Sequence, residues 1–199
     1  MNGDAGRFAA QRTLASPSRE RRSVDASTSS ILTSVHIRPA IPADLPAIGR
    51  LGALLVQTHH AFDPQRFLEA TDQTRASYAR FLGTQLEQPD ATVLVADDEG
   101  AVVGYVFMAI EGYDYLQLRG PAGILHDIIV TPEHRGRGTG RLLLEAALDY
   151  MKARGVPRIV LFTAAQNEAA QRLFASTGFR RTMVEMTMDV DPGGSKQTL

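Results

Sequence analysis

Glycine alternates with arginine and threonine in one short stretch of the chain, which reads Arg-Gly-Arg-Gly-Thr-Gly. An apolar, strand-like run at 124–130 precedes it, and a run with helical spacing of leucine and alanine follows from Arg141. The first N–H groups of a helix have no partner within the helix, and they carry the positive end of its dipole. A strand, a glycine-rich turn and a helix start in this order therefore predict a site for the phosphate groups of a cofactor. The candidate residues are Arg135, Gly136, Arg137, Gly138, Thr139 and Gly140.

Two common nucleotide-binding motifs do not fit this stretch. A P-loop ends in Gly-Lys followed by Ser or Thr, and residues 135–140 contain no lysine. A Rossmann motif spaces its glycines as Gly-x-Gly-x-x-Gly and has an acidic residue at the end of the next strand. Here the glycines alternate at every second position, and the next predicted strand, 158–163, ends without an acid. The spacing excludes both motifs.

A second motif lies at residues 167–179, which read Asn-Glu-Ala-Ala-Gln-Arg-Leu-Phe-Ala-Ser-Thr-Gly-Phe. It predicts a short amphipathic helix that Asn167 caps and Gly178 ends. Together with Arg135-x-x-Gly138-x-Gly140 at this separation, it closely resembles the two signature motifs of the GNAT N-acetyltransferase superfamily. The resemblance extends over roughly residues 35 to 190.

The resemblance implies an α/β (α+β) fold with a single domain. Its sheet would be mixed and mostly antiparallel, with one splayed parallel strand pair and helices on both faces. It also implies acetyl-coenzyme A as the donor, with the pyrophosphate on residues 135–140 and the pantetheine arm between strands 124–130 and 158–163. The cofactor-binding residues beyond the glycine-rich loop would be Ile128, Ile129, Val130, Asn167 and Phe174.

The candidate catalytic residues are His126 and Asp127. Acetyl transfer to an amine needs a proton acceptor, because an alkylamine of pKa about 10.4 is mostly protonated at neutral pH. An imidazole titrates near pH 6.5, so we predict His126 as the base, against the alternative of a histidine bonded within the sheet. The stretch Leu-His-Asp-Ile from Leu125 is similar to the Leu-Glu-Asp-Leu of polyamine-type acetyltransferases, whose Glu is a proposed base. Asp127 would either attract a cationic amine or hold a neighbouring loop.

Strict alternation along strand 124–130 would place His126 and Asp127 on opposite faces of the sheet. One face would carry Ile124, His126, Ile128 and Val130, and the other Leu125, Asp127 and Ile129.

Phe174 departs from the family pattern. Many members have Tyr at this position, where the hydroxyl can protonate the departing thiolate, and Phe has no such proton. Either Tyr113, Tyr115 or ordered water supplies the proton, or the thiolate leaves unassisted. The latter is chemically tolerable because a free thiol has a pKa of about 8.5.

Two predicted loops carry the candidates for acceptor binding. His60 and Phe62 lie between the first two predicted helices, and Tyr113 and Tyr115 follow the third predicted strand. The two tyrosines lie between carboxylates, and such a group can enclose a cationic amine by charge and cation–π attraction. The alternative is a solvated loop with incidental tyrosines.

Apolar periodicity and turn residues predict the elements that position these groups. A hairpin turn is expected at Asp98-Glu-Gly100. The order is β-α-α-β-β-β-α-β-α-β. Strands are expected at 35–39, 92–97, 102–110, 124–130, 158–163 and about 179–190. Helices are expected at 44–56, from Asp63 to Gln88 with a break near Thr71, at 138–154 and from Asn167.

Length and composition set further bounds. The 199 residues, 44% hydrophobic and 22% charged, fit one domain at 35–190, with a disordered extension at 1–34 and a flexible tail at 191–199. The net charge of −1 gives no case for nucleic acid or an anionic membrane as partner. The absence of cysteine excludes disulfides and thiolate metal sites, and the adjacent His59 and His60 are poorly placed to chelate a metal, so no metal is expected.

The combined prediction is a cytoplasmic N-acetyltransferase that moves an acetyl group from acetyl-coenzyme A to a primary amine of a small molecule, peptide or protein. Without a cysteine for an acyl-enzyme, direct attack in a ternary complex is expected. The competing class is a non-catalytic acyl-coenzyme A sensor or regulator. Its evidence is that Phe174 lacks a hydroxyl and that Ile124, at another position where such acetyltransferases often carry the base, cannot titrate. The acceptor stays open, and the alternating last strand is a candidate for pairing across a homodimer.

Overall fold

The structure is a computed structural model, and it describes residues 35–190. The expected disordered extension at 1–34 and the flexible tail at 191–199 lie outside the described residues. No helix within 35–190 has the length and apolar character needed to cross a membrane.

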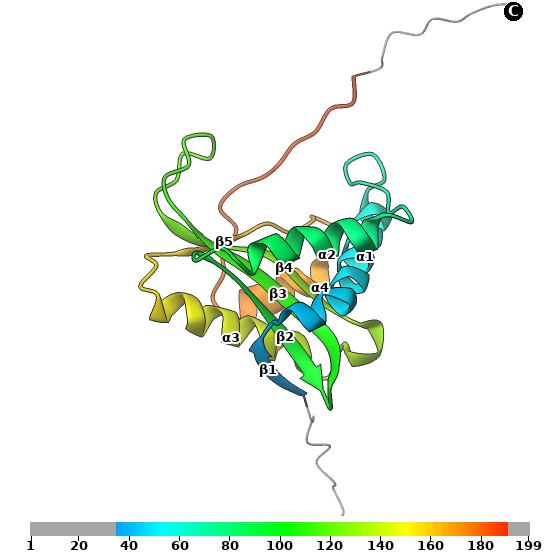
Figure 1. Ribbon diagram of the computed structural model, residues 1–199. Coiled ribbons are helices and arrows are strands. Elements are labelled where there is room, and N and C mark those ends of the chain that lie inside the picture. Colours follow the sequence, from blue (N-terminus) through cyan, green and yellow to red (C-terminus); the bar gives the residue numbers. More distant parts are fainter. Residues whose placement is uncertain (1–34, 191–199) are drawn as a thin grey trace, which may run out of the picture. The chain divides into compact units, whose positions relative to one another are not determined.

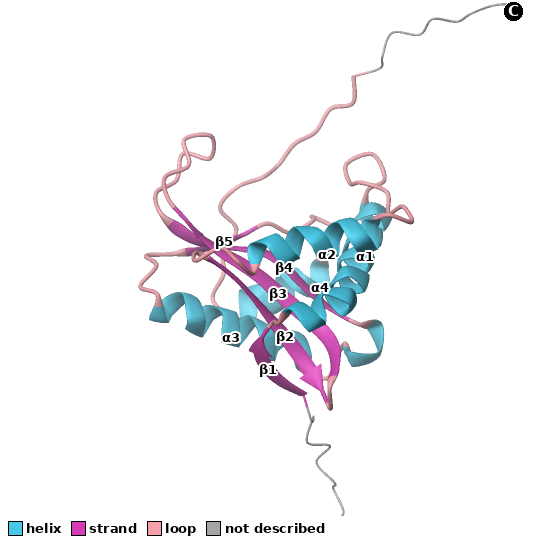
Figure 2. Ribbon diagram, viewed as in Figure 1, coloured by secondary structure: helices cyan, strands magenta, loops and turns pink. Residues whose placement is uncertain are grey.

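One sheet of five strands runs through the described region, in the order β1-β2-β3-β4-β5 (Figure 2). The first four strands pair antiparallel in chain order, and β5 pairs parallel with β4. This confirms the predicted mixed sheet with one parallel pair. The bounds are Val35–Pro39 (β1), Ala91–Asp98 (β2), Ala101–Glu111 (β3), Ala122–Val130 (β4) and Ile159–Leu161 (β5).

Helices cover both faces of this sheet, and each face has its own apolar core (Figure 1). On one face, α1 (Leu45–Phe62) and α2 (Thr74–Gln85) pack on β2 and β3 through Ile48, Leu51 and Leu82. On the other face, α3 (Thr139–Ala153) and α4 (Glu168–Ser176) supply the core, with two short 3-10 helices, η1 (Pro42–Asp44) and η2 (Pro132–His134), in the connections.

The predicted β2–β3 hairpin is confirmed. Glu99 and Gly100 occupy the turn with φ angles of 54° and 90°. Positive φ at both central residues is what a two-residue turn needs to match the twist of its strands, and glycine accepts that geometry without strain.

The prediction that the second helix begins at Asp63 is wrong. Helix α1 continues to Phe62, and the Asp63 carboxylate accepts hydrogen bonds from the backbone N–H groups of Gln65 and Arg66, both at 3.1 Å. An Asp side chain bonded to nearby backbone in this way forms a turn, which competes with helix propagation. The next helix, α2, begins only at Thr74.

The prediction of a last strand of the sheet at about residues 179–190 is also wrong. These residues are extended but belong to no strand. The alternating pattern gives a strand propensity, yet a strand is stable only when a neighbour supplies its hydrogen bonds. Several of its apolar side chains are exposed: Met183, Val184, Met186, Met188 and Val190.

Candidate active site

The glycine-rich loop has the backbone geometry that an anion site requires. Gly136 and Gly138 have φ angles of 71° and 90°, and Gly138 is the N-cap of α3. A Cβ at either glycine would meet nothing within 4 Å, so the need for glycine is conformational rather than steric. By contrast, a Cβ added at Gly140 would lie in ordinary contact range of the Leu173 side chain.

Charged and polar groups around this loop fit a pyrophosphate. Thr139, the first residue of α3, is fully buried, and its hydroxyl has no hydrogen-bond partner within residues 35–190. Arg135 and Arg137 are exposed beside the helix start. The Nε of Arg135 donates to the Val130 carbonyl at 3.0 Å, which fixes the arginine at the end of β4. The loop, the orphan hydroxyl and the helix N-terminus together form a cradle for phosphate oxygens.

Strand β4 loses its parallel neighbour halfway along its length. The β4–β5 pairing covers Gly123 to Leu125, opposite Ile159 to Leu161, and β4 then continues alone on that side to Val130. This is the predicted splay. Within the described residues, the backbone edge from His126 to Val130 therefore has no strand partner on the β5 side, which is where the cofactor arm was expected.

A β-bulge in β4 overturns the expected alternation of faces. Phe107 pairs with Asp127 and Met108 pairs with Leu125, so His126 is an extra residue in the ladder. The shift places His126 on the same face as Asp127, where its ring stacks on Phe107 with centroids 4.9 Å apart. Leu125, which was expected beside Asp127, packs instead in the α3–α4 core.

The bulge brings His126 to a carboxylate that sequence reasoning did not assign as its partner. The Nε2 atom of His126 lies 3.2 Å from Oε1 of Glu111, and both side chains are a little over one third exposed. The other oxygen of this carboxylate, Oε2, accepts a hydrogen bond from the Arg119 guanidinium. Arg119 also donates to the Gly112 carbonyl at 3.1 Å, so it holds Glu111 toward the imidazole.

Asp127 lies between the sheet and α2. One of its oxygens, Oδ2, accepts hydrogen bonds from the hydroxyls of Tyr78 at 2.6 Å and Tyr105 at 3.0 Å. Burial raises the pKa of Asp127, and the two tyrosine bonds oppose that rise. Burial next to Asp127 also raises the pKa of both tyrosines. Asp127 is thus tied to a helix and a strand, and no loop contact of its carboxylate is observed within the described residues.

The predicted acceptor-binding residues are not brought together into one group. The Nδ1 of His60 lies 3.0 Å from the Phe67 carbonyl, and Phe62 ends α1. Tyr113 and Tyr115 are 74% and 84% exposed in the β3–β4 loop, away from any stacking partner among residues 35–190.

The two residues expected at the reactive end of the cofactor lie on α4 or at its start. Asn167 caps the helix as predicted, accepting a bond from the backbone N–H of Ala170 at 3.2 Å. Phe174 is 5% exposed and packs in the α3–α4 core, with Phe179 at 5.9 Å between ring centroids. Ile128 packs against the same core, whereas Ile129 is buried in the α1–α2 core.

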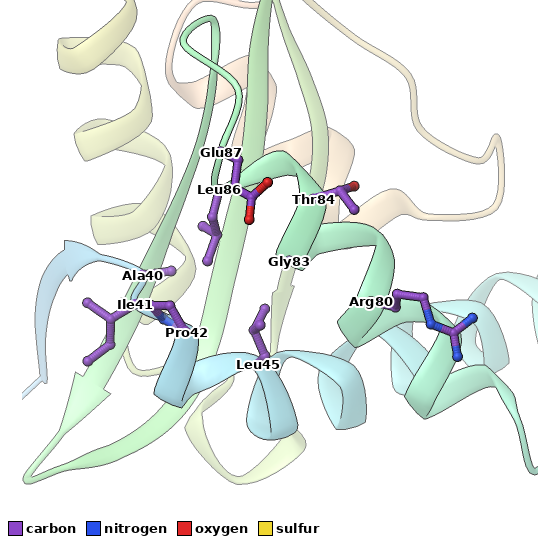
Figure 3. Close-up of a pocket in the computed structure, with 9 residues that line it drawn as sticks. All are labelled: Ala40, Ile41, Pro42, Leu45, Arg80, Gly83, Thr84, Leu86 and Glu87. Atoms are coloured by element: carbon purple, nitrogen blue, oxygen red, sulfur yellow. The ribbon is translucent and has the colours of Figure 1, made fainter.

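A separate pocket of about 440 Å³ lies between η1 and the end of α2 (Figure 3). Its walls include Ile41, Leu45, Arg80 and Glu87. No residue of β4, α3 or α4 lines it, so this pocket is distinct from the glycine-rich loop and from His126.

Comparisons with known proteins identify the family of this chain. Residues 55–179 match the family model described as Acetyltransferase (GNAT) family. A mycothiol acetyltransferase of Thermobispora bispora is 36% identical over 100 residues, which are 48% of this chain and 32% of that protein. This chain thus spans only about a third of the length of that relative.

Solved structures share the fold. A tetramutant of the BH1408 protein from Bacillus halodurans is 26% identical, with a TM-score of 0.68 over 78% of this chain and 99% of that one. An aminoglycoside N-acetyltransferase in complex with CoA is 18% identical, with a TM-score of 0.60 over 79% of this chain and 95% of that one, a likeness of fold alone. With the family model matched from the second half of α1 through α4, the chain belongs to the Acetyltransferase (GNAT) family.

Proposed function

We propose that this protein is an acetyl-coenzyme A-dependent N-acetyltransferase that acts on a primary amine by direct attack in a ternary complex. The observation that carries the proposal is the placement of two features along β4. The glycine-rich loop follows the end of this strand, and His126, held by Glu111, lies at its bulge. Strand β4 would thereby set the spacing between the donor's phosphates and the proposed base.

The chain's own groups would hold the donor at both ends. Backbone N–H groups of residues 135–140 and the Thr139 hydroxyl would bind the pyrophosphate. The unpaired β4 edge from Ile128 to Val130 would bind the pantetheine arm, with Asn167 near its reactive end. The bound donor would supply an acetyl thioester as the electrophile.

His126 would take the proton that the amine loses. If its Nε2–H points to Glu111, the lone pair of Nδ1 is free to accept a proton. The amine nitrogen then bonds to the thioester carbonyl carbon, the carbon–sulfur bond breaks, and the sulfur leaves with the electron pair. The exposure of His126 keeps it within reach of solvent, which can carry the proton away.

The negative charge beside His126 supports a class of acceptor. Glu111 places a carboxylate beside His126, an arrangement that favours a cationic amine over a neutral or anionic group. The mycothiol acetyltransferase among the similar proteins supports a small amine, and a peptide amine is the alternative. We place the reaction in the cytoplasm, where acetyl-coenzyme A is available.

Phe174 supports one competing function. Its buried ring provides no hydroxyl to protonate a leaving thiolate, which is compatible with a sensor that binds the donor without turning it over. Two measurements distinguish these functions. The first follows thiol release from acetyl-coenzyme A in the presence of polyamines, amino acids, aminoglycosides or peptides. The second measures donor affinity by calorimetry. Amine-dependent release supports the transferase. Donor binding without release from any amine supports the sensor.

A further inference from the structure

His134 is the last residue of η2 and comes directly before the glycine-rich loop. Its Nδ1 atom lies 2.9 Å from Oγ1 of Thr131, and its Nε2 atom lies 3.1 Å from Oδ2 of Asp98. An ionised carboxylate can only accept, so Nε2 donates to Asp98, and the Thr131 hydroxyl can donate to Nδ1. Both ring nitrogens thus have partners within the protein. Neither is left to take a proton from the acceptor or to bind an oxygen of the donor.

Asp98 belongs to a distant part of the chain that the sheet brings to the end of β4. It is the last residue of β2, and the turn after it leads into β3, where Gly104 pairs with Val130 at the end of β4. The neighbouring Asp97 is 5% exposed and accepts a hydrogen bond from Arg38 of β1 at 2.8 Å. The end of β2 is therefore firmly held. The contact between His134 and Asp98, 36 positions apart, joins the start of the loop to this part of the sheet.

The glycine-rich loop needs an external source of order. Fixing a glycine costs more conformational entropy than fixing any other residue. A Cβ at Gly136 or Gly138 would meet nothing within 4 Å, so side-chain packing does not hold these two positions. The loop must then be ordered from its two ends, which are α3 on one side and η2 on the other. A loop that is ordered before the donor arrives loses less entropy on binding.

We propose that His134 is a positioning residue for the donor: its bond to Asp98 holds η2 in place and so orders the glycine-rich loop for the pyrophosphate. The backbone N–H of His134 donates to the Thr131 carbonyl at 3.0 Å, and that of Arg135 donates to the Pro132 carbonyl at 3.2 Å. A shift of the imidazole is thereby passed to the first residue of the loop. A single 3-10 turn has poorer hydrogen-bond geometry than an α-helix, so it depends on such a side-chain anchor. The identity of the ligand rests on the proposed function, whereas the ordering of the loop does not.

Two substitutions at His134 separate its two bonds. The amide of Gln reaches the position of Nε2, and the amide of Asn reaches only that of Nδ1. In calorimetry, His134→Gln should bind coenzyme A within about twofold of wild type, whereas His134→Asn should bind it about three- to tenfold more weakly. At saturating donor, kcat should be equal in all three proteins, because His134 does not touch the reacting groups. Equal affinity in the two variants, whether lowered or not, overturns the proposal.

A double-mutant cycle identifies Asp98 as the partner. In the Asp98→Ala background, His134→Gln and His134→Asn should bind coenzyme A equally, because the acceptor that distinguishes them is gone. A difference in affinity that persists without the Asp98 carboxylate overturns the role of this contact.

Limited proteolysis without a ligand tests the ordering of the loop independently of the proposed function. Trypsin cleaves after arginine, and Arg135 and Arg137 lie within the loop. Mass spectrometry should show faster cleavage at these two sites in His134→Asn than in wild type or His134→Gln. Cleavage after the exposed Arg80 on α2 should be equal in all three and is the control for global unfolding. Equal cleavage of the loop in the three proteins overturns the inference even where wild type binds coenzyme A. Faster cleavage in His134→Asn, with no binding of coenzyme A by wild type, refutes the proposed function and supports the ordering of the loop by His134.

Discussion

The imidazole Nε2 of His126 lies 3.2 Å from Oε1 of Glu111, and the opposite oxygen of the same carboxylate accepts from Arg119. This chain of contacts fixes the orientation of the imidazole. It depends on the bulge in β4, which turns His126 to the face where Glu111 can meet it.

Replacement of Glu111 tests this orientation. Glu111→Ala should lower kcat on the order of tenfold, because the imidazole loses the partner that holds its ring. Glu111→Gln, whose amide oxygen can still accept the Nε2–H, should retain more activity than the Ala variant. Glu87→Ala, an exposed acid at the end of α2, is the control. Steady-state rates equal to wild type in Glu111→Ala would contradict the positioning role.

Asp127 makes stability depend on pH. Burial raises its pKa, so the folded state favours the protonated form, and stability falls as pH rises through the folded pKa. Asp127→Asn cannot ionise and keeps an oxygen for Tyr78 and Tyr105. It should therefore raise the free energy of unfolding at pH 7, with the gain shrinking toward the ordinary carboxyl pKa near 4. Urea unfolding at several pH values measures this, and a gain that does not vary with pH would refute it.

Gly138 should be needed for donor binding. Its φ of 90° is strained for any residue with a Cβ, at about 1–2 kcal/mol, so Gly138→Ala should weaken donor affinity roughly tenfold by calorimetry with coenzyme A. Gly140→Ala is the matched control, because its Cβ would meet Leu173 only at 3.6 Å and its φ is not positive. Equal losses of donor affinity in the two variants would contradict the dependence of donor binding on the positive φ at Gly138.

Gly52 lets α1 approach the ring of Tyr78. A Cβ there would lie 2.1 Å from Cδ1 of that ring. Gly52→Ala should destabilise the protein by about 1–3 kcal/mol through overpacking and should move Tyr78 off Asp127. Gly83→Ala, whose Cβ would meet only the flexible end of Leu45 at 3.2 Å, is expected to be milder. Thermal unfolding measures the stability of the two variants. A loss of stability in Gly52→Ala that is equal to or smaller than that in Gly83→Ala would contradict this packing.

Features that depend on local backbone chemistry could be predicted from the sequence. Three such features are the positive φ of Gly136 and Gly138, the turn at Glu99 and Gly100, and the cap at Asn167. At these positions the residue types themselves favour the local geometry, because glycine accepts positive φ and asparagine caps a helix. The mixed sheet followed from the order of the elements, and its splayed parallel pair followed from the family resemblance.

Features that depend on distant partners could not be predicted. The bulge at His126 is a matter of register between two strands, and no residue in β4 marks it. Tyr78 reaches Asp127 on β4 from helix α2, 49 positions away in the chain. Residues 179–190 carry a strand pattern, but the pattern does not say whether a neighbouring strand is present.

The most direct test of the proposed acetyl transfer measures the acetylated amine itself. Mass spectrometry would follow product from acetyl-coenzyme A and the amine that gives the greatest thiol release, for wild type and His126→Ala at saturating donor. Direct acetyl transfer predicts one acetylated amine per thiol released by wild type. In His126→Ala it predicts a kcat lower by about a hundredfold or more, with donor affinity unchanged. Equal kcat across pH in the two proteins would contradict His126 as the base, and donor binding without acetylated product would contradict the transferase.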